Sequence, residues 1–210
     1  RQYQSRAGFE GLGDISDLFS DLFGTRSAAG KATGRGRDSH YQLQIDFITA
    51  ATGGQTRITL PDGKPLNVAI PEGIADGQTI RLKGLGQPGR NGGPAGDALI
   101  EVHVQPHPTF ERKGDDIQSE LALTLDEAIL GAKVEVATVR GRLAVTVPKG
   151  ASSGQILRLK GRGIKSKAGE PGDHLVRLKI VSPKVIDDEL ETFMKGWRER
   201  HAYNPRSDVP

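Results

Sequence analysis

Two stretches of this chain of 210 residues repeat each other at an offset of about 77 residues. Ile70–Gly73 followed by Asp76–Gly86 matches Val147–Gly150 followed by Ser153–Gly163. Pro94–Asp97 is matched by Glu170–Asp173, and Phe47, Ala50 and Gly53 are matched by Leu125, Ala128 and Gly131. Three separated matches at one offset predict two homologous domains, residues 39–110 and 111–182, that arose by duplication.

Alternating apolar residues in the first copy predict β-strands. Tyr41, Leu43, Ile45 and Phe47 alternate with polar residues, and so do Leu66, Val68 and Ile70, as in strands with one apolar face. The sequence Pro61-Asp62-Gly63-Lys64 predicts a tight turn that uses a positive φ. Further short strands are expected at 57–60, 79–83 and 98–104. The sequence therefore predicts a mainly β fold, with two small β-sandwich-like domains and short helices.

Two segments outside the copies show helical spacing. Residues 1–38 contain one apolar stripe, formed by Ile15, Leu18, Phe19, Leu22 and Phe23, and then a basic linker rich in Gly, Ala and Thr. The stripe either belongs to a flexible tether or docks weakly in an apolar groove elsewhere in the chain. In residues 183–210, Asp187 is expected to cap a helix that presents Leu190, Phe193, Met194 and Trp197 on one face. This helix either covers an edge of the second domain or pairs with another subunit.

Composition excludes several classes of protein. The net charge of +3, from 29 basic and 26 acidic side chains, indicates a mixed surface instead of a nucleic-acid footprint over the whole chain. The chain has no cysteine, which excludes a disulfide framework and a thiolate metal site and fits a reducing compartment such as the cytoplasm. No apolar run is long enough to span a membrane. The start, Arg1-Gln2-Tyr3-Gln4, lacks an initiator Met, so we expect further residues upstream.

No set of residues predicts catalysis. Residues 84–89 match the pattern G-x-G-x-x-G, but the following residues 90–94 cannot open a phosphate-binding helix. His103 is expected in a strand and His107 lies between prolines, so the two do not share a helix face as metal ligands would. The acidic residues at 115–116 and 187–189 are interpreted as turn and helix-start charges. We therefore expect no enzyme activity, no cofactor and no metal.

Four segments, in order along nearly the whole chain, resemble the J-domain co-chaperones of the DnaJ family. Phe9–Gly11 with Asp17–Gly24 is similar to the end of the family's Gly/Phe-rich region, and Ile80–Gly86 with Gly92–Asp97 to its first C-terminal domain. His107–Asp116 is similar to the junction of its two C-terminal domains, and Leu125–Gly131 to the start of the second. The family's Cys repeats and its J-domain have no counterpart here, which implies the zinc-free class and no stimulation of a partner ATPase. The residues Ala202–Arg206 resemble the ending of one bacterial subgroup.

The resemblance implies where this chain would bind its partners. It implies an apolar groove for extended client segments in the first domain, at Tyr41, Leu43, Ile58, Leu60 and Phe110. Periodicity alone leaves open that these are ordinary core residues. It also implies a homodimer through Leu190, Phe193, Met194 and Trp197. The expected partners are unfolded polypeptide clients and a DnaK-type ATPase chaperone, in protein folding and the stress response, without a membrane.

The alternative class is a nucleoid-associated DNA-binding protein. Basic residues gather in the linker, at Arg26, Lys31, Arg35 and Arg37, and near the end, at Lys195, Arg198, Arg200 and Arg206. Such contacts with DNA would be made to phosphates and would depend strongly on salt. A purely structural assembly module is a third class, and it predicts no binding of unfolded protein.

Overall fold

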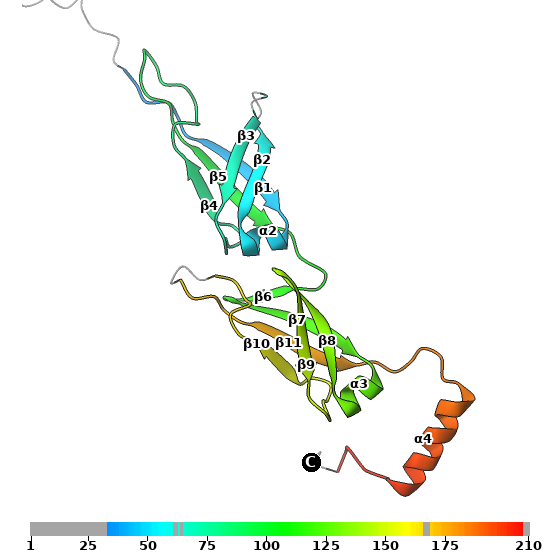
Figure 1. The fold of residues 1–210 in the computed structure, drawn as a ribbon. Helices are drawn as coiled ribbons and strands as arrows, with labels where there is room; N and C mark the ends of the chain where they lie inside the picture. Colours follow the sequence, from blue (N-terminus) through cyan, green and yellow to red (C-terminus); the bar gives the residue numbers. More distant parts are fainter. Residues whose placement is uncertain (1–32, 61–62, 64, 166–168, 208–210) are drawn as a thin grey trace, which may run out of the picture. The chain divides into compact units, whose positions relative to one another are not determined.

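A computed structural model describes residues 33–60, 63, 65–165 and 169–207 (Figure 1). Within these ranges the chain divides into two compact units, residues 33–43 with 79–102 and residues 44–78 with 103–207. The described residues form mainly strands with short helices and a C-terminal helix, so the predicted fold class is confirmed. None of the described helices is both long and apolar enough to cross a membrane. The predicted apolar stripe at 15–23 lies outside the described residues.

The first copy consists of five strands and one short helix. These are β1 (Ser39–Ile45), α2 (Phe47–Thr52), β2 (Gly54–Thr59), β3 (Pro65–Ile70), β4 (Thr79–Leu82) and β5 (Ala98–Val104). Strands β1, β5 and β4 form one sheet in that order, and β2 pairs with β3 as an antiparallel hairpin.

The second copy repeats this order of elements. It contains β6 (Glu111–Lys113), β7 (Asp116–Leu123), α3 (Leu125–Leu130), β8 (Ala132–Thr138), β9 (Gly141–Val147), β10 (Ile156–Leu159) and β11 (His174–Ile180). Its sheet has the order β10-β11-β7-β6, and β8 with β9 forms the hairpin. Strands β10, β11 and β7 thus stand in the same order as β4, β5 and β1, as expected of a duplication. The last helix is α4 (Asp188–Arg200).

Strand β1 ends two residues before the alternation predicts. The sequence predicts that Phe47 continues this strand, but Phe47 is the first residue of α2, so the prediction is wrong there. The cause is Asp46, whose carboxylate accepts hydrogen bonds from the hydroxyl of Thr49 at 2.6 Å and from its N–H at 2.8 Å. These bonds satisfy a helix N–H that would lack a partner, and they lower the pKa of Asp46. Helix α3 begins in the same way, with a capping box between Thr124 and Glu127.

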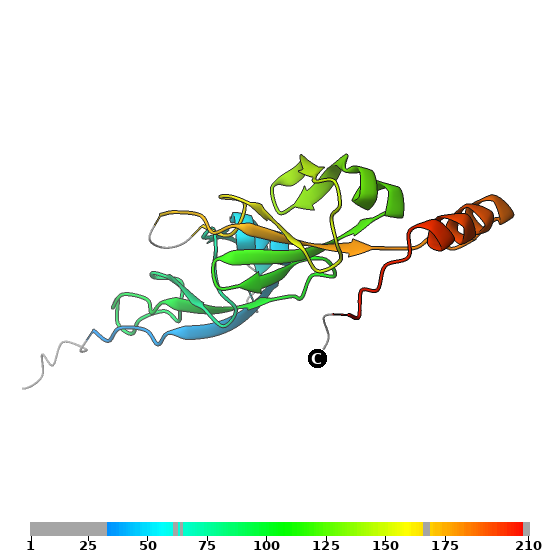
Figure 2. The same ribbon diagram turned by 90° about the horizontal axis from the view of Figure 1, so that it is seen from below.

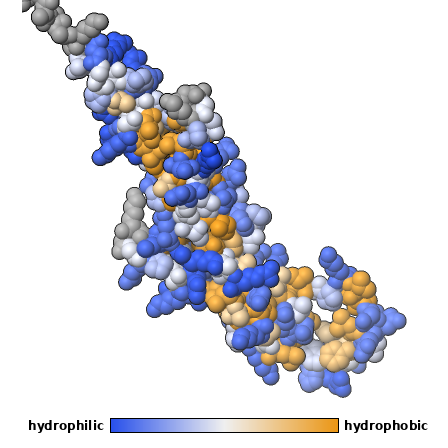
Figure 3. Space-filling model, turned by 45° about the horizontal axis from the view of Figure 1, so that its top comes forward, coloured by the Kyte–Doolittle hydropathy of each residue, from blue (hydrophilic) through white to orange (hydrophobic). Residues whose placement is uncertain are grey.

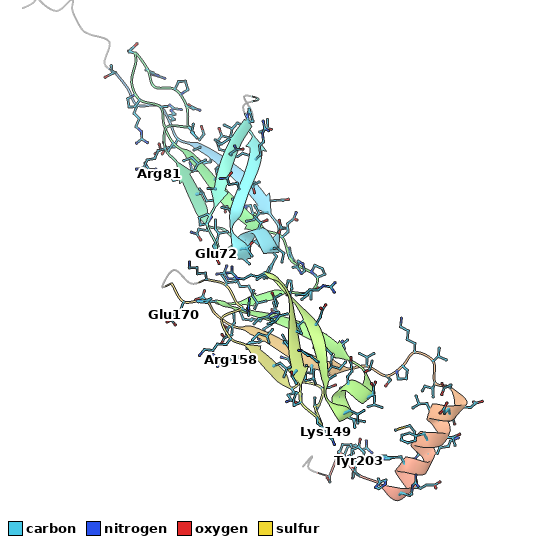
Figure 4. The ribbon with its side chains drawn as sticks, in the orientation of Figure 1. Glu72, Arg81, Lys149, Arg158, Glu170 and Tyr203 are labelled. Carbon is cyan, nitrogen blue, oxygen red and sulfur yellow. The ribbon has the colours of Figure 1, made fainter. Side chains whose placement is uncertain are left out.

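One aspartate in each copy ties the sheet to the loop before its last strand. Asp97 is 4% exposed, and its carboxylate accepts the N–H of Gly84 at 2.8 Å and Nε of Arg81 at 2.7 Å. The second copy repeats this network with Asp173, Gly161 and Arg158. Figure 4 labels the two corresponding arginines, Arg81 and Arg158. In both copies the bonds to the glycine N–H and then to the arginine hold the aspartate pKa below its usual value. The duplication therefore extends to individual hydrogen bonds.

The second copy is a two-layer sandwich (Figure 2). Val136 and Val145 of the hairpin pack with Val176 of β11, and all three are buried. Leu123, Val147 and Leu178 form a second buried cluster. Burial of each such side chain contributes roughly 1.5–3 kcal/mol relative to exposure, so these apolar faces hold the hairpin on the sheet.

Candidate functional site

The first predicted binding residues lie on β1. Tyr41, Leu43 and Ile45 alternate along one face of this strand. Ile45 is 5% exposed, Leu43 is 8% exposed, and Tyr41 is only half-buried. Burial thus decreases toward the start of β1, where an aromatic side chain remains partly accessible to solvent.

The hairpin β2–β3 shows a similar gradient. Ile58 lies opposite Leu66, and both are half-buried, whereas Val68 on the same face is fully buried. Leu60 follows the end of β2 and is also half-buried. Its carbonyl accepts the N–H of Gly63 at 2.8 Å, and Gly63 has the positive φ that the predicted turn requires. The apolar face of this hairpin therefore becomes accessible toward its turn.

Phe110, the fifth predicted binding residue, belongs to a core. It is 7% exposed and clusters with Phe47, Ile117 and Ile164. Its ring stacks on His107, with centroids 4.8 Å apart. A binding partner could reach this ring only if the core opened.

The second copy differs at the positions that correspond to the predicted groove. When Phe47 is aligned with Leu125, Tyr41, Ile58 and Leu60 correspond to Ser119, Val136 and Thr138. All three second-copy residues are buried, at 7%, 3% and 9% exposure. Ser119 Oγ lies 2.7 Å from Nε2 of His174, and the hydroxyl of Thr138 donates to the carbonyl of Gly141 at 2.7 Å. At these three positions the second copy is thus closed, and partly polar, where the first is apolar and half-open.

His174 is the most unusual side chain of the second copy. It is fully buried, and its Nδ1 has no hydrogen-bond partner among the described residues. The ring of Phe110 lies against it in a T-shaped arrangement, with centroids 5.7 Å apart. Burial lowers the pKa of His174, because the charged imidazolium would lose its hydration there.

The C-terminal helix forms as predicted. Asp187 caps α4, and its carboxylate accepts the N–H of Leu190 at 2.8 Å. Leu190 is half-buried, whereas Phe193, Met194 and Trp197 are 62%, 41% and 36% exposed. No residue of this helix is buried, so its apolar face remains accessible in the single chain.

That face borders an apolar hollow of about 860 Å³, shared by α4, the segment 181–184 and α3. Apolar residues gather in this part of the surface (Figure 3). Ile129 and Leu130 at the end of α3 are 53% and 68% exposed. The corresponding helix of the first copy differs, because Ala51, at the position of Ile129, is 2% exposed and packs with Phe110. The outer face of α2 is therefore covered, whereas that of α3 is open.

The basic residues expected in the linker are only partly described. Arg26 and Lys31 lie outside the described residues. Arg35 binds the carboxylate of Asp97 at 2.9 Å, and Gly36 donates its N–H to the carbonyl of Pro94 at 2.9 Å. Arg37 is exposed. This end of the expected linker therefore belongs to the first unit.

The basic residues near the end are mostly exposed. Lys195 pairs with Glu191 at 2.5 Å, and Nε of Arg200 donates to the carbonyl of Gly196 at 3.1 Å. Arg198 and Arg206 are exposed and make no side-chain ion pair within the described part of the chain.

The glycine-rich motif and His107 take part in hydrogen bonds that hold the backbone of turns and loops. Gly84 lies in a turn with φ of 72°, and its N–H is bound by Asp97. Nδ1 of His107 accepts the N–H of Thr109 and that of Phe110, at 3.1 and 3.2 Å. Across the residues that can be described, no group of three or more His, Cys, Asp or Glu side chains is arranged to hold a metal ion.

The structure thus contains two copies of a sheet with a hairpin and a capped helix, followed by a helix with an open apolar face. Residues 39–183 match the family model of the DnaJ C terminal domain, and the chain belongs to this family.

The chain is also similar to bacterial proteins named curved DNA-binding protein. The one from Pseudomonas putida KT2440 is 38% identical over 224 residues, which cover 95% of this chain and 70% of the relative. The one from Escherichia coli O157:H7 is 36% identical over 211 residues, covering 93% and 69%. The one from Coxiella burnetii RSA 493 is 34% identical over 230 residues, covering 99% and 73%. These relatives confirm the resemblance to curved-DNA-binding protein A that the ending 202–206 predicts.

Proposed function

We propose that this chain is the client-binding part of a DnaJ-family co-chaperone, which holds extended segments of unfolded protein on its first copy and delivers them to a DnaK-type ATPase chaperone. The observation that carries the proposal is the difference between the two copies. Tyr41, Ile58 and Leu60 are apolar and half-buried, whereas the corresponding positions of the second copy are closed. Under this proposal residues 39–110 act as the client-binding domain and residues 111–182 as its support.

The small number of partly exposed apolar side chains, Tyr41, Ile58 and Leu60, predicts weak binding of a client. An extended client can lie along a strand and place alternate side chains against an apolar face. Burial of a Leu-sized client side chain contributes roughly 1.5–3 kcal/mol, and association costs at least about 4 kcal/mol. Two or three buried side chains therefore give an affinity near or weaker than micromolar. Weak binding suits a carrier that must release its client.

The test is suppression of aggregation of a chemically denatured model protein. We compare the chain with Ile58→Ser/Leu60→Ser, which changes half-buried residues and spares the buried Leu43. The matched control is Leu143→Ser, a half-buried residue in the hairpin of the second copy. We expect protection by the chain and by the control at low and high salt, and loss of protection in the double variant. Equal protection by the double variant would refute the proposed groove.

We also propose that the chain dimerises through α4. Phe193, Met194 and Trp197 expose one apolar face, and Ile129 and Leu130 expose a second across the hollow. The α4 helix of another molecule of this chain, seated there, would remove both faces from water. Two linked client sites would then bind one long client with higher avidity than either site alone.

The dimer is tested by light scattering. Phe193→Asp/Met194→Asp is expected to give monomers, because each carboxylate would have to be buried at the interface. The control Thr192→Asp places one such carboxylate on the opposite side of α4 and should leave the dimer intact. A double variant that remains dimeric would refute this placement.

DNA binding is the second candidate function. It is favoured by the names of the relatives and by exposed basic side chains near the C-terminus, such as Arg198 and Arg206. With a net charge of only +3, the contacts would be confined to local patches. Binding of labelled duplex DNA that weakens steeply with salt would support this function, and no binding at low salt would exclude it.

A further inference from the structure

Among the described residues, four basic side chains gather on the end of β10 and the loop that follows it. They are Arg158, Lys160, Arg162 and Lys165, and all are exposed. Arg158 is committed to the carboxylate of Asp173. The other three form no side-chain hydrogen bond or ion pair with any residue that the structure describes. This basic loop, as we call Lys160, Arg162 and Lys165, therefore offers three cations to a partner.

The backbone that carries the basic loop is held in place. Gly161 donates its N–H to Asp173 at 2.7 Å, and Gly163 donates to the carbonyl of Gly172 at 2.8 Å. Ile164 donates its N–H to the carbonyl of Asp115 at 2.8 Å, and its side chain is 1% exposed. The side chain between Arg162 and Lys165 is thus buried while those two remain exposed. An anchored backbone reduces the entropy that the loop would lose on binding.

The corresponding loop of the first copy carries fewer cations, namely Lys83 and Arg90. Lys160 has a counterpart in Lys83, but the repeat offset places Leu85 at the position of Arg162 and Pro88 at that of Lys165. The surrounding hydrogen bonds are the same, since Gly86 donates to Gly96 as Gly163 donates to Gly172. The scaffold therefore does not require the extra cations.

One carboxylate lies on the same segment. Glu170 is exposed and corresponds to Pro94 in the first copy. Figure 4 shows Arg158 and Glu170 projecting from this part of the second copy. Glu170 reduces the local positive charge but leaves an excess of two cations among the side chains that the structure describes on this segment.

We propose that the basic loop is a contact site for the sugar-phosphate backbone of duplex DNA. This assignment rests on the second candidate function above. The segment presents cations from a loop, without a helix or an aromatic side chain, which suits phosphate contacts better than the reading of base edges. Because the rest of the chain is nearly balanced in charge, this locally unpaired set supplies a large share of the attraction.

The test is anisotropy of labelled duplex DNA over a range of salt concentrations. Lys160→Gln/Arg162→Gln/Lys165→Gln removes up to three phosphate contacts, and each contact contributes about 0.9 to the slope of log affinity against log salt. The slope should therefore fall by about 2 to 3. The control Arg57→Gln/Lys83→Gln/Lys149→Gln removes the same total charge from three other exposed positions and should retain a nearly unchanged slope.

A variant with higher affinity for duplex DNA provides a second readout, because a poorly folded variant would not gain affinity. Glu170→Gln removes the nearby negative charge and should strengthen binding severalfold at low salt. If the unaltered chain binds no duplex DNA, the candidate function and this assignment both fail. If it binds and the loop variant keeps its full slope, the assignment alone is wrong. If the loop variant keeps DNA binding but loses binding to an acidic peptide, the loop serves a protein partner and the assignment is overturned.

Discussion

Acidification is expected to destabilise the second copy through His174. This side chain is fully buried against Ser119, which lies 2.7 Å from its Nε2, and against the ring of Phe110 in a T-shaped arrangement. The carboxylate of the neighbouring Asp173 does not neutralise an imidazolium here, because it is already bound by Gly161 and Arg158. Protonation would therefore place a charge in the core without a counter-ion.

The direction in which stability changes with pH follows from the lowered pKa of His174. Burial holds the folded-state pKa of His174 below 6.5, the value expected in the unfolded chain. Between these two pKa values the unfolded chain binds the extra proton, so stability is complete above 6.5 and falls as the pH falls. One proton gives a loss of up to about 1.4 kcal/mol per pH unit until the folded-state pKa is reached. Asp97 and Asp173 have pKa values below 3.8, so their effects come at lower pH.

The assay is urea unfolding followed by circular dichroism at several pH values between about 7.5 and about 5. His174→Gln removes the titrating group and can retain a hydrogen bond to Ser119, so its stability should depend less on pH in this window. The control His201→Gln removes an imidazole from an exposed position and should behave as the unaltered chain. An equal pH dependence in His174→Gln and in the unaltered chain would refute the reasoning.

Three further changes test the packing, the last helix and the aspartate network. Ile164→Ala should cost about 2–5 kcal/mol in urea unfolding, because its side chain is 1% exposed; an unchanged midpoint would contradict its place in the core. Gly196→Ala should stabilise α4 by about 1 kcal/mol, since the added Cβ meets only the Arg200 guanidinium at 3.8 Å; a weaker helical signal in circular dichroism would argue against this. Asp173→Asn should lower the unfolding midpoint at neutral pH and remove part of the loss that occurs as pH falls below 3.8; the same acid profile as the unaltered chain would exclude its role.

The fold follows largely from the sequence because two copies repeat each signal. Apolar alternation predicts β1 and β3, Asp187 predicts the start of α4, and Gly63 predicts a turn. Alternation fails at Phe47, because the N–H of Thr49 donates a local hydrogen bond to the N-cap carboxylate of Asp46, and this bond overrides a periodicity that fits a strand equally well. Glycine and arginine content likewise suggests a linker at Arg35. The structure instead places Arg35 in the first unit, where it binds Asp97, 62 residues away in the sequence.

The candidate site is less predictable, because periodicity identifies a face but not its degree of burial. Tyr41 and Leu43 share one pattern, although only Tyr41 is half-open. Phe110 lies in a family-like motif, yet tertiary packing places it in a core with Phe47 and Ile117. The open end of α3 has a signal in the sequence, since Ile129 and Leu130 replace the smaller Ala51 and Thr52, but only the structure shows that nothing in the described part of the chain covers them.

The two copies have diverged at positions that the shared scaffold leaves free. Asp97 binds Gly84 and Arg81 in the same way as Asp173 binds Gly161 and Arg158, so both copies tie the sheet to its loop by the same hydrogen bonds. The differences lie elsewhere: Tyr41 against Ser119 on the first strand, and Leu85 against Arg162 in the loop. A residue outside the network can change without loss of the fold, so one copy can keep an accessible apolar face while the other gains charge. The proposed client site and DNA contact therefore fall on different copies, and variants in one should leave the other function intact.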